Sequence, residues 1–318
     1  MAFETFRDPL PQESAYSDLP SSYERYIYKP TAFPKTEKSL KDLFRAQITT
    51  FPYENLSVHY SPTHLVNIHP DALYTKMMGA LNNGRGGYCM ELSIFFHHML
   101  RGLGFRVYMT GVRNRTRTNG VPQGETQGWT HINNIIHLPD GSKFSADVAF
   151  GGDGPTLPLG SQDIRLVYDV LPKQQLLEPK VWIYQYRNGA DKPWNSFYSF
   201  LEVEFFQGDF EVQNWWASAK TLHRWTVLAV RFLREGETIE YPHQGRGANC
   251  KEEINIVGKV MLVNNLVKLN MGNKTTVIRQ VDSEEQRLSA LWDYFGIRLT
   301  EEEAESINGW DMALTNSN

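Results

Sequence analysis

The chain contains little cysteine and no long hydrophobic run. Only two of its 318 residues, Cys89 and Cys250, are cysteines, too few for a disulfide framework and typical of a reducing compartment. No window approaches the roughly eighteen consecutive apolar residues that a membrane span needs, and the N-terminal sequence lacks the apolar core of a signal peptide. We therefore expect a cytoplasmic protein without a membrane partner.

The chain also lacks an excess of charge of either sign. Its 32 Lys and Arg residues nearly balance 36 Asp and Glu residues, for a formal net charge of −4. This balance indicates neither a nucleic-acid-binding surface nor an acidic disordered tail. With 41% hydrophobic residues, 318 residues suffice for about two or three domains with a full core.

The hydrophobic patterns divide the chain into three blocks, which predict an α+β fold rather than a βαβ repeat. Residues 1–104 have helical spacing, with helices expected from about Lys38 to Thr49 and from Cys89 to Gly104. Residues 105–208 contain short β-rich runs separated by Asp-Gly and Asn-Gly turns, which predict a β-barrel. Residues 209–318 mix both types. Strands are expected at 105–110, 131–137, 143–148, 164–168, 181–186, 197–206, 225–232, 254–263 and 275–281, and helices at 210–219 and from 283.

Cys89 stands directly behind Gly86-Gly87-Tyr88 and opens an amphipathic helix. A helix N-terminus presents unpaired N–H groups and a partial positive charge, which favour a thiolate there. The ordinary alternative is a small apolar residue that fills the core, as most free cysteines do. Cys250 has no motif around it.

A reactive thiol needs a base and a group that orients the base. His131 begins an alternating strand, and Asp147 follows sixteen residues later, at the end of the next strand. Two strands joined by a hairpin bring such residues side by side, so we expect His131 and Asp147 to be neighbours. Taken alone, each has an ordinary explanation, as a strand histidine and as a turn residue.

These segments resemble the arylamine N-acetyltransferase family. Arg85-Gly-Gly-Tyr-Cys89 resembles its nucleophile motif, and Pro52-Tyr-Glu-Asn-Leu56 resembles its Pro-Phe-Glu-Asn-Leu element. His131 behind Gly128, and Ala146 to Gly151, resemble the segments that supply the base and its carboxylate. The resemblance spans about residues 20–300. The extended N-terminus and the segment Gly152-Asp-Gly-Pro155 are most similar to those of fungal members.

The resemblance implies a helical bundle that holds Cys89, a β-barrel that holds His131 and Asp147, and an α/β lid, around a thiol-protease-like Cys-His-Asp core. It implies ping-pong transfer of an acyl group, acetyl or else propionyl or malonyl, from acyl-coenzyme A to an arylamine or arylhydrazine in detoxification. No metal is implied, and the adjacent His97 and His98 point in different directions, which disfavours a metal pair.

Further residues receive expected roles from the same segments. Glu54 and Arg85 are interpreted as a buried supporting pair. Tyr53, where family members commonly have Phe, adds a hydroxyl to the wall that faces the acceptor, and Gly128 permits close approach of the substrate. The remaining candidates for substrate contact are Trp129, beside His131, and Phe150, which is either a pocket aromatic or ordinary core.

The run Arg113-Asn-Arg-Thr-Arg117 is the sharpest charge feature. The ordinary interpretation is a solvated hairpin loop. Alternatively, one of these arginines, with Arg113 the first candidate, binds a coenzyme phosphate or the carboxylate of a malonyl donor. Two other functions remain open: a thiol hydrolase with the same Cys, His and Asp order, and a catalytically idle binding protein on this fold.

Overall fold

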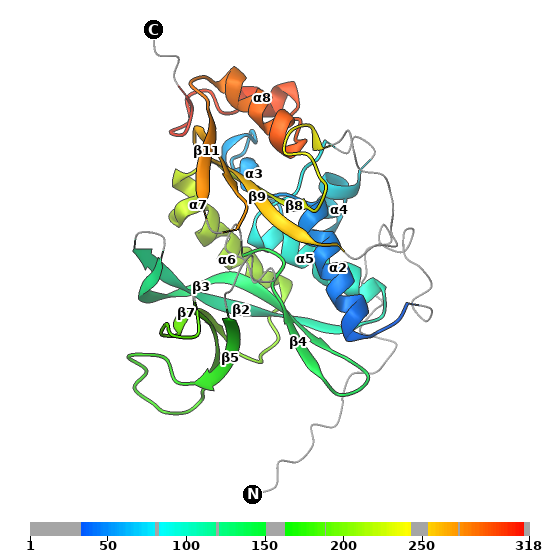
Figure 1. The fold of residues 1–318 in the computed structure, drawn as a ribbon, viewed down its shortest axis with the longest axis vertical. Coiled ribbons are helices and arrows are strands. Elements are labelled where there is room, and N and C mark those ends of the chain that lie inside the picture. The colour runs from blue at the N-terminus through cyan, green and yellow to red at the C-terminus, as the bar shows by residue number, and fades with distance from the viewer. Residues whose placement is uncertain are drawn as a thin grey trace, which may run out of the picture.

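The computed structural model describes residues 33–79, 83–118, 121–150, 163–187, 189–242, 254–272 and 274–314. Two antiparallel sheets and the helices packed on them form the molecule (Figure 1). Cys250 and Gly152-Asp-Gly-Pro155 lie outside the described residues. The N-terminal elements are α2 (Glu37–Thr50), β1 (Tyr53–Glu54), α3 (Leu56–His59), α4 (Pro70–Met78) and α5 (Cys89–Gly102).

Helix α5 is the central element of the main hydrophobic core. Its apolar side chains recur at helical spacing, and Leu92, Phe96 and Leu100 are at most 2% exposed. Each such buried side chain contributes about 1.5–3 kcal/mol of transfer free energy. The helix packs against α4 and two long strands of the first sheet. The prediction that Cys89 opens a helix is confirmed, and the helix ends at Gly102, two residues before the expected end.

The first sheet has six strands in the order β4-β3-β2-β7-β6-β5, all antiparallel. It is curled (Figure 1), and among the described residues no pairing joins its outer strands β4 and β5, so the expected barrel is a half-barrel. The strands are β2 (Arg106–Thr118), β3 (Val121–His137), β4 (Lys143–Ala146), β5 (Asp163–Asp169), β6 (Val181–Arg187) and β7 (Asn195–Phe200).

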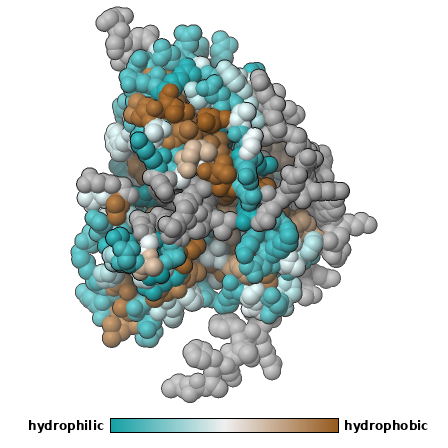
Figure 2. Space-filling model, viewed as in Figure 1, coloured by the Kyte–Doolittle hydropathy of each residue, from teal (hydrophilic) through white to brown (hydrophobic). Residues whose placement is uncertain are grey.

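The second sheet has the order β1-β8-β9-β10-β11, so a strand from the N-terminal part joins four from the C-terminal part. Figure 2 shows hydrophobic side chains gathered on the upper part of the molecule, where this sheet lies, and its edge strand β11 exposes Val277 and Ile278. The strands are β8 (Leu228–Arg234), β9 (Ile256–Val263), β10 (Leu266–Asn270) and β11 (Thr275–Gln280), and the helices are α6 (Gln207–Lys220), α7 (Leu222–Trp225), α8 (Glu284–Phe295) and α9 (Glu301–Glu305).

Three sequence predictions need correction. The arginine run 113–117 lies inside strand β2 and is not a loop. The strand expected at 197–206 ends at Phe200, and the strand expected from Trp225 begins at Leu228, because residues 222–225 form α7. Strand β10 was not expected at all. Among the described residues, no helix is long and apolar enough to cross a membrane.

Candidate active site

Cys89 is the first residue of α5, and strand β1 fixes the loop that leads to it. Gly87 donates a hydrogen bond from its N–H to the Pro52 carbonyl oxygen at 3.3 Å, and the Gly87 carbonyl accepts one from Glu54 N–H at 2.9 Å. A Cβ atom on Gly86 would lie 1.9 Å from the Pro52 oxygen, so this close approach requires glycine. The motif that begins at Pro52 and the glycine pair before Cys89 are therefore joined by backbone hydrogen bonds.

The thiol lies at the positive end of the α5 dipole and is nearly buried, with Cys89 3% exposed. The Glu91 carboxylate, three residues into the helix, accepts a hydrogen bond from Tyr88 N–H at 3.0 Å. This contact satisfies one N–H group at the start of the helix and fixes the backbone just before the cysteine.

His131 and Asp147 lie next to each other, as their spacing predicts. His131 Nε2 donates a hydrogen bond to Asp147 Oδ2 at 2.7 Å, and both residues are 2% exposed. The second carboxylate oxygen accepts a hydrogen bond from Ala149 N–H at 3.1 Å. The Cys89 thiol is close enough to the same ring to help raise the pKa of His131, so the thiol and the carboxylate both act on one imidazole.

The electrostatics of this cluster favour a charged imidazole. Burial by itself lowers the pKa of His131, but the Asp147 carboxylate and the hydrogen bonds to Asp147 and Cys89 outweigh burial and raise the pKa to about 10. The arrangement can therefore hold an imidazolium between two groups that are anionic when deprotonated.

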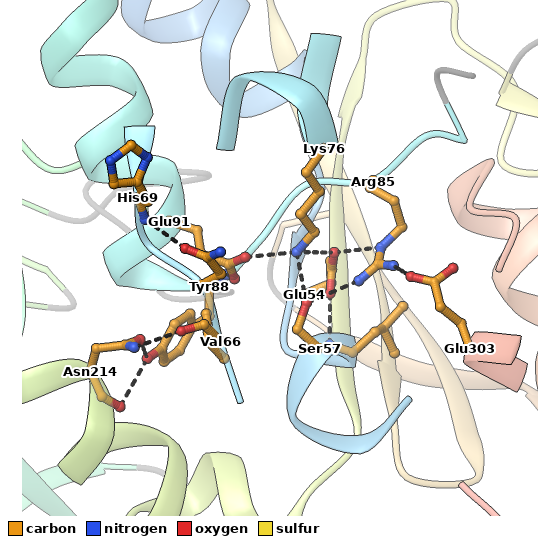
Figure 3. A network of polar contacts seen from close by, with 12 residues as sticks. Glu54, Ser57, Val66, His69, Lys76, Arg85, Tyr88, Glu91, Asn214 and Glu303 are labelled. Carbon is orange, nitrogen blue, oxygen red and sulfur yellow. Dashed lines mark hydrogen bonds and ion pairs between the residues drawn. The ribbon is translucent and has the colours of Figure 1, made fainter. Parts of the chain in front are cut away.

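Glu54 and Arg85 form the expected buried pair, and Figure 3 shows that the pair belongs to a longer chain of charges. Arg85 Nε donates to Glu54 Oε1 at 3.0 Å, and Leu56 N–H donates to Glu54 Oε2 at 2.6 Å. Burial by itself raises the pKa of Glu54, but the charges of Arg85 and Lys76 outweigh it and lower the pKa to about 2. Glu54 is therefore ionised throughout the physiological range.

The chain of charges includes residues that the sequence did not reveal. Lys76 of α4 lies 3.2 Å from Glu54 Oε1 and 2.7 Å from Glu91 Oε1, and Arg85 Nη1 pairs with Glu303 of α9 (Figure 3). Lys76 has no motif around it, and Glu303 is 218 residues from Arg85. The ion pairs thus connect the start of α5 with α4 and the C-terminal part of the chain.

Tyr53 is 8% exposed, and its hydroxyl lies 3.3 Å from Nε2 of the buried His223 on α7. Burial, together with the charges of Cys89 and Asp147, raises the pKa of Tyr53 well above its usual value, so the phenol stays neutral. The His223 ring also packs edge-on against Tyr88 at 4.9 Å. His223 is a site neighbour that sequence reasoning missed.

The aromatic and arginine candidates divide between the site and the sheet. Phe150 has its ring centroid 5.3 Å from that of His131 and also packs on Tyr198 at 5.0 Å, so it belongs to both site and core. The Arg113 guanidinium carbon lies 4.1 Å above the Trp129 ring. A Cβ atom on Gly128 would meet nothing within 4 Å in the described residues. Among those residues, no cluster of His, Cys, Asp and Glu could hold a metal ion.

Comparisons with known proteins identify relatives over most of the chain. A family described as N-acetyltransferase matches residues 37–239. The chain is 27% identical over 335 residues to N-malonyltransferase FDB2 of Gibberella moniliformis, covering 96% of this chain and 89% of that one. It is 28% identical over 202 residues to the arylamine N-acetyltransferase of Mycobacterium tuberculosis strain H37Rv, covering 63% of this chain and 69% of that one.

Solved structures share the fold. The arylamine N-acetyltransferase from Salmonella typhimurium superposes with a TM-score of 0.66 at 22% identity, covering 91% of this chain and 98% of that one. The Mycobacterium marinum arylamine N-acetyltransferase in complex with CoA superposes with a TM-score of 0.61 at 20% identity, covering 89% and 97%.

Proposed function

Because the chain belongs to the arylamine N-acetyltransferase family and is therefore an acyltransferase, we propose that it transfers an acyl group from acyl-coenzyme A to an arylamine or arylhydrazine nitrogen through a thioester on Cys89. The observation that carries this proposal is the contact between His131 and Asp147, with the Cys89 thiol acting on the same imidazole.

In the first half-reaction, the Cys89 thiolate attacks the carbonyl carbon of the acyl-coenzyme A thioester. The bond between that carbon and the coenzyme sulfur breaks, and coenzyme A leaves with a proton from the His131 imidazolium. Asp147 holds the imidazole in one orientation and stabilises its charged form. The acyl group is then bound to Cys89.

In the second half-reaction, the amine nitrogen attacks the thioester carbon, Cys89 leaves as thiolate, and His131 takes the proton that the nitrogen loses. Tyr53, Gly128, Trp129, Phe150 and Arg113 are the proposed substrate contacts. Residues 1–104, 105–208 and 209–318 are the proposed domains: a helical bundle with Cys89, a half-barrel sheet with His131 and Asp147, and an α/β lid.

We propose acetyl-coenzyme A as the donor, with propionyl- or malonyl-coenzyme A as the alternatives. The name of the Gibberella relative supports the malonyl donor. With two cysteines in the chain, the cytoplasm is the proposed compartment, and detoxification of aromatic amines is the proposed role.

A donor-by-acceptor matrix tests this function. Release of coenzyme A is measured with each donor, with and without an aniline, an aminophenol and a hydrazine, using the wild type and Cys89→Ala. We expect release that requires both the amine and Cys89. Equal release without any amine would instead identify a hydrolase, and no release with any pair would contradict transfer.

A further inference from the structure

His223 is a buried histidine to which the proposed reaction assigns no role. It is 7% exposed and lies on α7, in the C-terminal part of the chain, but its ring contacts both segments that meet just before Cys89. Its Nε2 atom lies 3.3 Å from the Tyr53 hydroxyl, and the ring packs edge-on against that of Tyr88 at a centroid distance of 4.9 Å. Tyr53 belongs to β1, and Tyr88 directly precedes the candidate nucleophile.

The surroundings of His223 assign its tautomer. Asn55 Oδ1 accepts a hydrogen bond from Leu228 N–H at 2.8 Å, so the Asn55 atom that lies 3.5 Å from His223 Nδ1 is Nδ2, which only donates. A hydrogen on Nδ1 would point at this donor, so Nδ1 carries none. Burial is the main cause that lowers the pKa of His223 to about 3, so the ring is neutral. Its one ring hydrogen is therefore on Nε2, which donates to the Tyr53 oxygen.

Helix α7 has only four residues, and the segment that follows β1 holds it in place. Asn55 Nδ2 donates to the carbonyl oxygen of His223 at 3.2 Å and to that of Thr226 at 2.7 Å. His59 Nε2 lies 3.1 Å from the same Thr226 oxygen. These contacts fix the backbone at His223 and just after it, so they also fix the place from which its ring extends.

The two tyrosines lie on opposite sides of the backbone bridge before the nucleophile. Tyr53 is bridged to Gly87, and Glu54 N–H donates to the Gly87 carbonyl oxygen at 2.9 Å. Tyr88 follows Gly87, and its own N–H donates to Glu91 Oε2 at 3.0 Å. One imidazole thus contacts both of the chain segments whose pairing fixes the start of α5.

We propose that His223 is a positioning residue for Cys89. Its Nε2–H group and its ring hold Tyr53 and Tyr88 together, which keeps the bridge between Tyr53 and Gly87 closed and the thiol in its place. The inference rests on the proposed function in one respect, that Cys89 is the nucleophile. Because a displacement of about 1 Å at the reacting atoms can cost about 10²-fold in rate, a residue that acts only through its neighbours can still determine the rate.

Three substitutions separate the two contacts of His223. His223→Gln keeps an N–H donor for Tyr53 but loses the ring, His223→Phe keeps a ring against Tyr88 but loses the donor, and His223→Leu loses both. His97→Leu is the matched control. His97 is also a buried histidine, 5% exposed, and burial lowers its pKa well below the usual value, but it lies in the middle of α5.

Amide hydrogen exchange in the folded proteins measures opening of the bridge without any turnover. The relevant groups are Glu54 N–H and Gly87 N–H, which donate to Gly87 and Pro52 carbonyl oxygens. Amides in the centre of β9 report global unfolding in the same sample. Relative to them, the two bridge amides should exchange about 10-fold faster in His223→Leu than in the wild type, and less so in the Gln and Phe variants. In His97→Leu this ratio should stay at the wild-type value.

Rapid mixing with acyl-coenzyme A measures the consequence for the first half-reaction. The maximal rate of coenzyme A release should fall about 10- to 100-fold in His223→Leu and less in the other two variants, with an unchanged half-saturating concentration of acyl-coenzyme A. A purely structural role would lower the unfolding free energy and leave this rate unchanged.

Three results would overturn the inference: unchanged exchange of the two bridge amides, an unchanged rate of release, or losses that His97→Leu shares. If the wild type itself releases no coenzyme A, the proposed function fails, and the exchange of the bridge amides alone decides whether His223 holds the segment before Cys89.

Discussion

His131 and Asp147 meet diagonally across the hairpin of β3 and β4. The register pairs Asn134 with Ala146, so Asp147 lies just beyond the last paired residue of β4, and its Oδ2 atom is 2.7 Å from His131 Nε2. The strand end frees the Asp147 backbone from the ladder, and its other oxygen accepts from Ala149 N–H at 3.1 Å. The carboxylate is thereby held by the turn that follows the strand.

Asp147→Asn tests whether this contact sets the state of His131. Without the carboxylate, burial dominates and lowers the pKa of His131, so the imidazolium is lost at neutral pH. We expect the rate of acyl transfer from acyl-coenzyme A to Cys89 to fall about 10²- to 10⁴-fold, as for other oriented bases. Rapid-mixing measurement of coenzyme A release checks this. Asp140→Asn, in the exposed turn of the same hairpin, is the control and should transfer at the wild-type rate.

The same contact makes stability depend on pH. The pKa of His131 is about 10 in the folded chain and 6.5 in its ordinary state, so protonation favours folding. This contribution is complete below about pH 6.5 and is lost as the pH rises through 10. The difference in unfolding free energy between the wild type and Asp147→Asn should therefore shrink from pH 6 to pH 10. Urea titrations at a series of pH values measure it, and a difference that grows with pH would show the sign to be wrong.

The buried pair Glu54 and Arg85 gives a prediction on stability. Removing one partner leaves the other buried charge with a single ion pair, Glu54 with Lys76 or Arg85 with Glu303, so Glu54→Gln or Arg85→Met should each cost about 1.5–3 kcal/mol of unfolding free energy. The double variant should cost less than the sum of the two, because neither of the two charges is then left in the core. Urea denaturation of the four proteins checks this. Additive losses would mean that the two side chains act independently.

Two glycines of the site should respond differently to alanine. Gly86→Ala places a Cβ atom 1.9 Å from the Pro52 oxygen, so β1 and the loop before Cys89 must separate, with an expected loss of about 2–4 kcal/mol. Gly128→Ala meets nothing within 4 Å in the described residues and should leave stability within about 0.5 kcal/mol. If substrate passes Gly128, the KM for acyl-coenzyme A should rise in that variant. Thermal denaturation and initial rates separate the two effects.

The local parts of the site could be predicted from the sequence because each depends on neighbours along the chain. The helical spacing after Cys89 places the thiol at a helix N-terminus, and a hairpin in which Asp147 follows sixteen positions after His131 brings the two together. Strand β10 escaped prediction, because Leu266–Asn270 is short and follows directly on the turn at Asn264. The arginine run is polar and has a low strand propensity. It is nevertheless part of β2, because β3 and β7 pair with it.

Contacts between distant segments could not be predicted. Tyr53 meets His223 across 170 residues, and Arg85 meets Glu303 across 218. Strand β1 is only two residues long and joins a sheet built mainly from the C-terminal part of the chain. No local spacing records such pairings, since they depend on how the sheets and helices pack after each has formed.

Mass spectrometry of the protein mixed with acyl-coenzyme A tests whether Cys89 carries the acyl group. The wild type should gain the mass of one acyl group without any amine, the adduct should map to the peptide with Cys89, and an arylamine should remove it. Cys89→Ala should gain nothing. An acyl group on another residue, or amine acylation that persists in Cys89→Ala, would rule out Cys89 as the acyl carrier.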